Sequence, residues 1–123
     1  MKPYVWYHGS PEKLTTLKPG SYVTPFAELA KAYSHKPAEL SFAFTEDTDK
    51  DEILVEVEQN GRQTGFLYQV TLQNPEADLR PSVEKTSPLG EEMVTVKEQQ
   101  VKCIESEIQP EKTYAFKIAM RSF

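Results

Sequence analysis

The chain has 123 residues and a mass of 14.0 kDa, the size of a single domain that can bury a core without help from a disulfide or a metal. Its 38% hydrophobic and 27% charged residues are typical of a globular protein, which excludes a disordered or fibrous chain. The 14 Lys and Arg against 19 Asp and Glu leave a net charge of -5, which argues against general binding to nucleic acid or anionic membranes.

The first predicted elements are two short strands and a helix. The strands cover 4–8 and 21–23, and each is bounded by turn-forming residues. Thr24 and Pro25 are typical of a helix start, with Thr24 as the N-cap. Pro37 is expected to end this helix. Four apolar residues recur at the spacing of one helical face: Phe26, Leu29, Ala30 and Tyr33.

After the helix the pattern predicts strands. Six short segments are rich in β-branched and aromatic residues: 40–44, 53–57, 66–72, 93–96, 101–108 and 114–118. One helix followed by many strands, without β-α-β alternation, predicts an α+β fold with mostly antiparallel sheets in one domain over 1–123. The segment from Pro75 to Pro88 is predicted as a long surface loop.

Metal and redox chemistry have few candidate residues. The lone cysteine, Cys103, excludes an intramolecular disulfide and a cysteine-based zinc site, and two histidines predict no conventional transition-metal site. His35, near the helix C-terminus, needs no catalytic role. No apolar run reaches the ~20 residues of a membrane span, and the N-terminus has no signal-peptide pattern. We therefore expect a metal-free protein of the reducing cytoplasm.

One acidic stretch has the spacing of a calcium loop. Asp47, Asp49 and Asp51 are followed by Glu58, eleven positions after Asp47. The sixth position holds Glu52 where the loop needs Gly, and the residues after it have a strand pattern. The interpretation that fits is a solvated acidic turn.

The tripeptide His8-Gly9-Ser10 ends the first predicted strand. A glycine lets a ligand approach the backbone closely, and the histidine and serine beside it add side-chain donors. The plainer interpretation is a strand end with a tight turn.

Tyr22 and Tyr33 have ten residues between them, one on a strand and one on the helix that follows. Such a corner can bring two rings to one cleft, where a flat cationic ligand would gain roughly 0.5–2 kcal/mol from their faces. The alternative is that both are core aromatics.

Glu91 and Glu92 precede the apolar segment 93–96. A carboxylate at a strand end can accept a hydrogen bond from a sugar hydroxyl and stabilise positive charge at an anomeric carbon. The alternative is plain solvation, because the chain has 19 acidic residues.

Taken in order, these three groups resemble the His–Tyr–Glu branch of the ADP-ribosyltransferase superfamily, which includes diphtheria-type toxins, the poly(ADP-ribose) polymerases and small rifamycin-modifying transferases. In that family a strand carries His-Gly-Ser or His-Gly-Thr, the next corner carries the two tyrosines, and a late strand begins with the catalytic Glu. The resemblance covers residues 4 to about 108. It implies a split antiparallel β-sandwich with one N-terminal helix, and an NAD-dependent mono-ADP-ribosyltransferase without a metal.

The resemblance also implies how NAD is bound. His8 would donate a hydrogen bond to the adenosine-side ribose. Gly9 would pair its backbone with the nicotinamide carboxamide, with Ser10 close by. Tyr22 and Tyr33 would stack the nicotinamide ring, as a pyridinium cation prefers.

The catalytic role falls to Glu92, with His8 and Tyr22 as its partners. By the resemblance Glu92 would hold the 2′-hydroxyl of the nicotinamide ribose and stabilise the oxocarbenium-like transition state. Glu92 is favoured because it directly abuts the apolar segment, and Glu91 remains open as the alternative.

No motif in the sequence identifies the molecule that accepts ADP-ribose. Gly90 stands where several protein-modifying members place an acid or Gln, so a small molecule, a protein or a nucleic acid is open, with the charge weighing against nucleic acid. The absence of an Arg before a Ser-Thr-Ser segment excludes the arginine-modifying branch, and three arginines argue against an RNA 2′-phosphotransferase.

Open alternatives are an NAD glycohydrolase, a non-catalytic nucleotide-binding or protein-interaction module of the same fold, and a β-rich structural domain with an accidental motif. No pattern predicts the oligomeric state.

Overall fold

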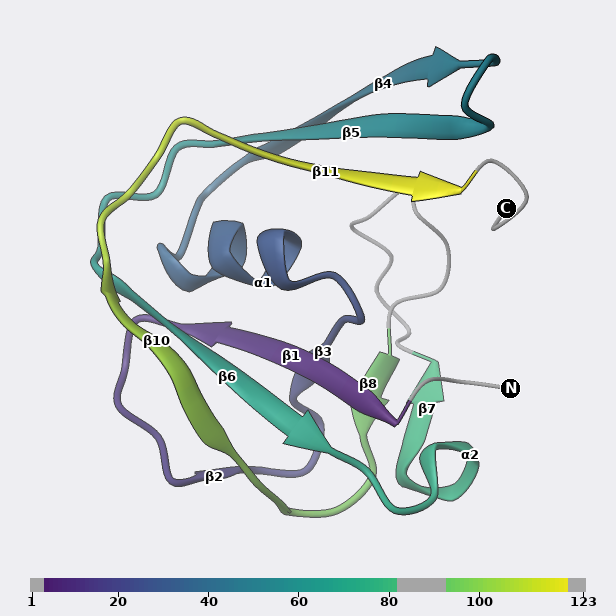
Figure 1. The fold of residues 1–123 in the computed structure, drawn as a ribbon. Helices are drawn as coiled ribbons and strands as arrows, with labels where there is room; N and C mark the ends of the chain where they lie inside the picture. Colours follow the sequence, from purple (N-terminus) through teal and green to yellow (C-terminus); the bar gives the residue numbers. More distant parts are fainter. Residues whose placement is uncertain (1–3, 82–92, 120–123) are drawn as a thin grey trace.

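Antiparallel strands wrapped around one short helix form the fold (Figure 1). The computed structural model describes residues 4–81 and 93–119. In chain order its elements are β1 (Val5–Ser10), β2 (Thr16–Leu17), β3 (Tyr22–Val23), α1 (Ala27–Ser34), β4 (Leu40–Asp47), β5 (Glu52–Gln59), β6 (Gly65–Thr71), α2 (Pro75–Asp78), β7 (Leu79–Pro81), β8 (Met93–Thr95), β9 (Gln99–Gln100), β10 (Lys102–Ile108) and β11 (Thr113–Ala119). This confirms the α+β class with antiparallel sheets. Neither described helix is long and apolar enough to cross a membrane.

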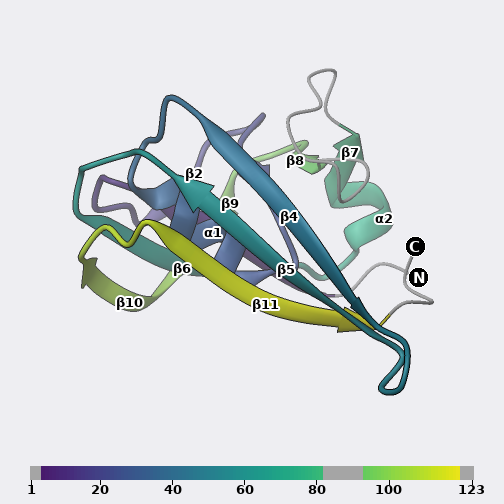
Figure 2. The same ribbon diagram turned by 90° about the horizontal axis from the view of Figure 1, so that it is seen from above.

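Two three-stranded sheets enclose α1. One has the order β1-β6-β10 and the other the order β11-β5-β4, and all pairs are antiparallel. Figure 1 and the view from above in Figure 2 place α1 between them. Two smaller sheets, β2-β9 and β3-β8-β7, complete the described part of the fold.

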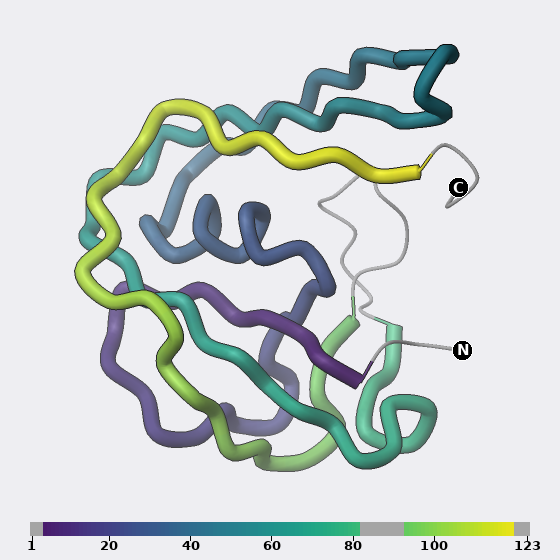
Figure 3. Tube along the Cα trace, viewed as in Figure 1, coloured from purple at the N-terminus to yellow at the C-terminus, as the bar shows by residue number. Residues whose placement is uncertain are grey.

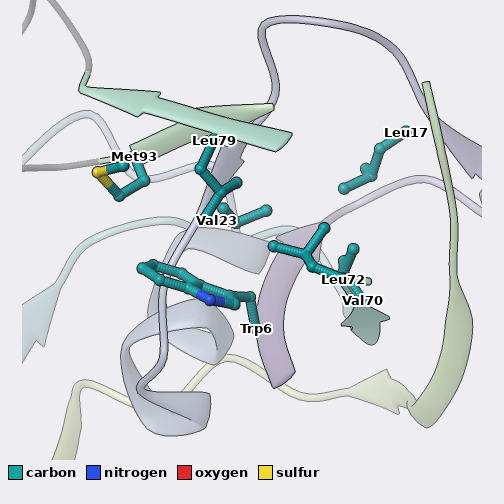
Figure 4. Packing of buried hydrophobic residues seen from close by; sticks show 7 residues of the cluster. All are labelled: Trp6, Leu17, Val23, Val70, Leu72, Leu79 and Met93. Atoms are coloured by element: carbon teal, nitrogen blue, oxygen red, sulfur yellow. The ribbon is translucent and has the colours of Figure 1, made fainter. Parts of the chain in front are cut away.

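The β1-β6-β10 sheet has an apolar cluster on each face. On the face away from α1, Trp6 packs in a cluster with residues of β2, β3, β6, β7 and β8, and Figure 4 shows the side chains of this cluster. On the opposite face, Tyr7 of β1 and Leu67 of β6 pack with Ala30 of the helix. This division follows from the strand pleat, which sends successive side chains to opposite faces.

A third apolar cluster joins α1 to the other sheet. Leu29 and Ala32 of the helix pack against Val55 and Val57 of β5 and Tyr114 of β11. The helix is therefore covered on two sides, as expected for a short helix whose stability comes from packing and not from length.

The helix begins two residues later than the sequence predicts. Thr24 is not the N-cap; Phe26 holds that position, and its N–H bonds to Thr24 Oγ1 at 3.2 Å. The Thr24 backbone is taken by a bridge to Tyr7 of β1, with N–O distances of 2.7 and 2.9 Å. At the other end, Lys36 has a φ of 54°, which ends the helix just before Pro37, as expected.

Two glycines let the helix approach the β1-β6-β10 sheet closely. A Cβ placed on Gly9 would overlap the carbonyl oxygen of Ala30, and one placed on Gly65 would overlap the Ser34 hydroxyl. Ala30 and Ser34 are four residues apart and so share one helical face. Small residues on both sides thus set the spacing between helix and sheet.

The six predicted later strands are all found, with bounds that differ by no more than three residues. The surface loop predicted for Pro75 to Pro88 is wrong over 75–81. Those residues form α2 and β7, and Pro75, Asp78 and Leu79 are buried. The remainder of that prediction, 82–88, lies outside the described residues. The acidic turn after β4 leads into a strand and not into the helix that a calcium loop requires.

Candidate functional site

Three short elements that are distant in the sequence lie next to each other at the candidate site. The bridge between Tyr7 and Thr24 joins β1 to the chain just after β3. β3 in turn pairs with β8, with Tyr22 opposite Val94. The predicted groups, apart from Tyr33 on α1, lie on these elements or directly beside them in the sequence.

His8 is the polar side chain at the centre of this arrangement. It is half-buried, and its Nδ1 lies 2.7 Å from the backbone oxygen of Tyr22, 14 positions away. A carbonyl oxygen only accepts, so Nδ1 carries a proton and donates it. Burial lowers the pKa of His8 below its usual 6.5, and the bond to Tyr22 opposes this only in part. At neutral pH the ring is therefore uncharged, with a lone pair on Nε2.

Gly9 and Ser10 both have structural contacts. Gly9 lies against the backbone of Ala30, where no side chain fits. Ser10 is buried, and its hydroxyl accepts a hydrogen bond from the Glu12 N–H at 3.1 Å. Both residues thus have structural roles: Gly9 lets α1 approach β1, and Ser10 holds the chain just after the strand end, as the plainer interpretation expects.

The two tyrosines differ in their surroundings. Tyr22 is 43% exposed on β3, and its backbone holds His8. Tyr33 is half-buried on α1 and packs with the apolar cluster between the helix and β5 and β11. The structure thus brings His8 and Tyr22 together, whereas Tyr33 packs toward the opposite sheet, as the core alternative expects.

Glu91 and Glu92 lie outside the described residues. The residue that follows them, Met93, begins β8 and pairs with Val23 of β3. The described chain thus resumes next to the strand that carries Tyr22.

Two buried side chains that the sequence pattern does not single out support this region. The Tyr68 hydroxyl accepts from Leu14 N at 2.7 Å and donates to Glu12 O at 2.8 Å. Burial raises the pKa of Tyr68, so the hydroxyl keeps its proton for this bond. Thr95 Oγ1 accepts from Ser21 N at 3.2 Å and holds the turn before β3. A Tyr and a Thr inside strand patterns carry no signal that distinguishes them from ordinary strand residues.

A separate polar depression of about 380 Å3 lies near α2. Its walls carry Asp78 and Lys97, which form an ion pair at 3.4 Å, together with Glu98 and four uncharged polar residues: Thr71, Gln73, Gln99 and Gln100. It includes none of the predicted site residues. Over 4–81 and 93–119, no group of three or more His, Cys, Asp or Glu is arranged to hold a metal ion.

Comparison of the chain with protein-family models, with curated proteins and with solved structures finds no match.

Proposed function

We propose that this chain is an NAD-dependent mono-ADP-ribosyltransferase with the split antiparallel β-sandwich of that superfamily. One observation carries the proposal. The segments bearing His8 and Tyr22 are joined by a hydrogen bond, and β3 pairs with the strand that directly follows Glu92 in the sequence. Motif residues dispersed along the chain thus belong to neighbouring elements, which an accidental motif does not require.

In this proposal His8 binds a ribose hydroxyl of NAD through Nε2. The resemblance implies donation by His8, but Nδ1 already donates to Tyr22 and the pKa is lowered. A neutral imidazole held this way accepts at Nε2, so the ribose hydroxyl would be the donor. The bond to the Tyr22 carbonyl also fixes the orientation of the ring.

Tyr22 is the better placed ring for stacking on nicotinamide. Its side chain is 43% exposed, whereas Tyr33 is packed in an apolar cluster. The nicotinamide of NAD is cationic until it leaves, so an aromatic face stabilises the bound substrate. Tyr33 would contribute through the part of its ring that remains accessible, and Gly9 and Ser10 through the backbone of β1.

Glu92 would act on the bond that breaks. The bond between the anomeric carbon and the nicotinamide nitrogen breaks, and nicotinamide takes the electron pair. The acceptor forms a bond to the same carbon and loses a proton. A carboxylate that holds the 2′-hydroxyl stabilises the positive charge that develops on the ribose between these two events.

The test is nicotinamide release from NAD by the purified protein. We expect Glu92→Gln to lower turnover by about a hundredfold or more while NAD affinity changes only a few-fold, since the charge acts mainly in the transition state. Glu98→Gln is the matched control, because Glu98 is an exposed acid outside the three groups. Calorimetry with His8→Ala and Tyr22→Ala should show weaker NAD binding.

Two outcomes would contradict the proposal. Equal loss of turnover in Glu92→Gln and Glu98→Gln would remove the role of Glu92. No NAD binding by the wild-type protein would remove the site itself, whereas binding without release across a panel of acceptors would favour a binding module.

A further inference from the structure

The hairpin of β4 and β5 carries the negative charge of the molecule. Residues 40–59 hold seven acidic side chains and one lysine, a net charge of -6, while the whole chain has -5. The rest of the chain is therefore close to neutral. Figures 1 and 3 show the end of this hairpin projecting beyond the body of the molecule.

β4 is an open sheet edge. Among the described residues it pairs only with β5, in an unbroken register from Leu40 opposite Gln59 to Asp47 opposite Glu52. An edge strand directs the N–H and C=O of alternate residues away from the sheet, where a further strand can pair with them. β4 has eight residues, no proline and no bulge, whereas the edge strand β10 is interrupted by two register shifts.

The inner face of β4 is apolar. Phe42 is half-buried and Phe44 is 42% exposed, and both lie on the side of the sheet that faces α1. Cross-strand partners share a face, so Val57 and Val55 of β5 continue the same apolar surface.

The outer face carries glutamates of β5, and Lys117 of β11, opposite Leu54, lies on the same face. Glu56 and Glu58 of β5 lie opposite Ala43 and Ser41 of β4. On their other side they lie opposite Ala115 and Thr113 of β11, which are equally small and uncharged. Within 4–81 and 93–119, neither glutamate has an ion-pair partner.

We propose that the β4 edge binds an extended polypeptide segment of alternating basic and apolar residues, which adds a fourth strand to the β11-β5-β4 sheet. Strand addition supplies backbone hydrogen bonds, and alternate side chains supply the specificity. The apolar residues of the partner would lie beside Phe42 and Phe44. Its basic residues would reach over Ala43 and Ser41 to the glutamates, across two strand spacings of about 4.8 Å each.

Charge decides between this partner and a second copy of the chain. Two hairpins of net charge -6 placed edge to edge would repel each other, whereas a basic strand would pair with glutamates that have no ion-pair partner within 4–81 and 93–119. The inference does not depend on NAD chemistry, so it can fail or hold separately from the proposed function.

The probe is the synthetic peptide Lys-Val-Lys-Val-Lys-Val-Lys-Val, titrated into 15N-labelled protein. We expect amide shift changes concentrated in β4 and slower hydrogen exchange of its outward-facing amides. The control peptide contains the same residues in another order: all its lysines come first and all its valines follow. It should bind about tenfold more weakly, because it matches charge but not the alternation of the strand.

The protein variants separate local charge from net charge. Glu56→Gln with Glu58→Gln should weaken binding of the alternating peptide by about tenfold or more at about 0.15 M salt. Glu12→Gln with Glu98→Gln changes the net charge equally at exposed positions outside the hairpin and should change affinity less than about twofold. Melting temperatures of both variants confirm that each is folded.

Three results with the peptides would overturn the proposal, and a fourth concerns the protein alone. The first three are equal affinity for the two peptides, equal losses in the two double variants, or shift changes outside β4 and its neighbours. A dimer with protected β4 amides in the absence of peptide would assign the edge to a second copy, and would overturn it as well.

Discussion

The protonation state of the His8 imidazole is set by the Tyr22 carbonyl and by burial of the ring. The carbonyl selects the tautomer with the proton on Nδ1, and burial disfavours the charged ring. A histidine in this state is a hydrogen-bond acceptor at its outer nitrogen. The presence of a histidine in the sequence does not tell whether its ring accepts a hydrogen bond, donates one or carries a charge.

This state predicts a pH dependence. The folded protein binds a proton at His8 less readily than the unfolded chain, whose pKa is near 6.5. The group therefore has no effect on stability well above pH 6.5, and destabilises the fold as the pH falls through 6.5 toward the lowered pKa. NAD binding should weaken as the pH falls through the lowered pKa of the folded protein, because a protonated Nε2 no longer accepts. Nitrogen NMR of the ring should give a midpoint below 6.5; a midpoint at or above it would contradict the burial argument.

Among the elements, β1 and α1 depend on each other through Gly9. Gly9→Ala should lower the unfolding free energy by about 3 kcal/mol or more, because the added Cβ overlaps the Ala30 backbone. The overlap can be relieved only if the whole helix shifts relative to β1. Gly20→Ala is the control: Gly20 has a φ of 85° but open space around it, so only conformational strain of about 1 kcal/mol is expected. Urea unfolding measures both. Equal costs would mean that the helix can shift away from the sheet.

The C-terminus of α1 is held by a buried polar pair that sequence reasoning left without a role. His35 is fully buried, with Nδ1 2.7 Å from the Gln63 oxygen and Nε2 2.5 Å from the Tyr114 hydroxyl. The Gln63 carbonyl accepts a hydrogen bond from Nδ1, and Nε2 shares a hydrogen bond with the Tyr114 hydroxyl. One histidine thus ties the helix to β11 and to the segment before β6.

The elements themselves could mostly be predicted from local patterns, and their ends could not. The Thr24-Pro25 pair has the composition of a helix start, but tertiary pairing with Tyr7 takes the Thr24 backbone into a strand bridge. Pro75 and Asp78 have the composition of a loop, yet the Asp78 carbonyl accepts from Val96 N at 2.9 Å, its carboxylate pairs with Lys97, and the segment forms a turn of helix. In both places contacts with distant residues outweigh local preference.

Part of the candidate site could be predicted from the sequence and part could not. The order of its groups is visible in the sequence, and the structure places His8 beside Tyr22. The packing of Gly9 against α1 and of Tyr33 toward β5 could not be predicted, because both depend on how the helix lies between two sheets. Tyr68 and Thr95 were missed because their hydrogen bonds are made to backbone groups of distant loops.

The whole molecule has apolar clusters on both sides of the β1-β6-β10 sheet, and they share β1, β6 and α1 between them. We therefore expect one cooperative unfolding transition. Val70→Ala, in the cluster around Trp6, and Val55→Ala, in the cluster between α1 and β5, should each cost about 2 kcal/mol. The fluorescence of Trp6, the only tryptophan, reports the first cluster and far-ultraviolet circular dichroism reports all the strands. Non-coincident transitions in either variant would show that the two halves unfold separately.

The concentration of acid on the β4–β5 hairpin gives the molecule a permanent electric dipole, because the remainder of the chain is nearly neutral. Such a molecule does not meet charged partners in random orientations. A cationic surface draws the hairpin end toward itself before contact, which shortens the rotational search and makes the association rate fall with added salt. The same field turns the hairpins of neighbouring copies away from one another, so an open strand edge can persist at high protein concentration without nucleating aggregates.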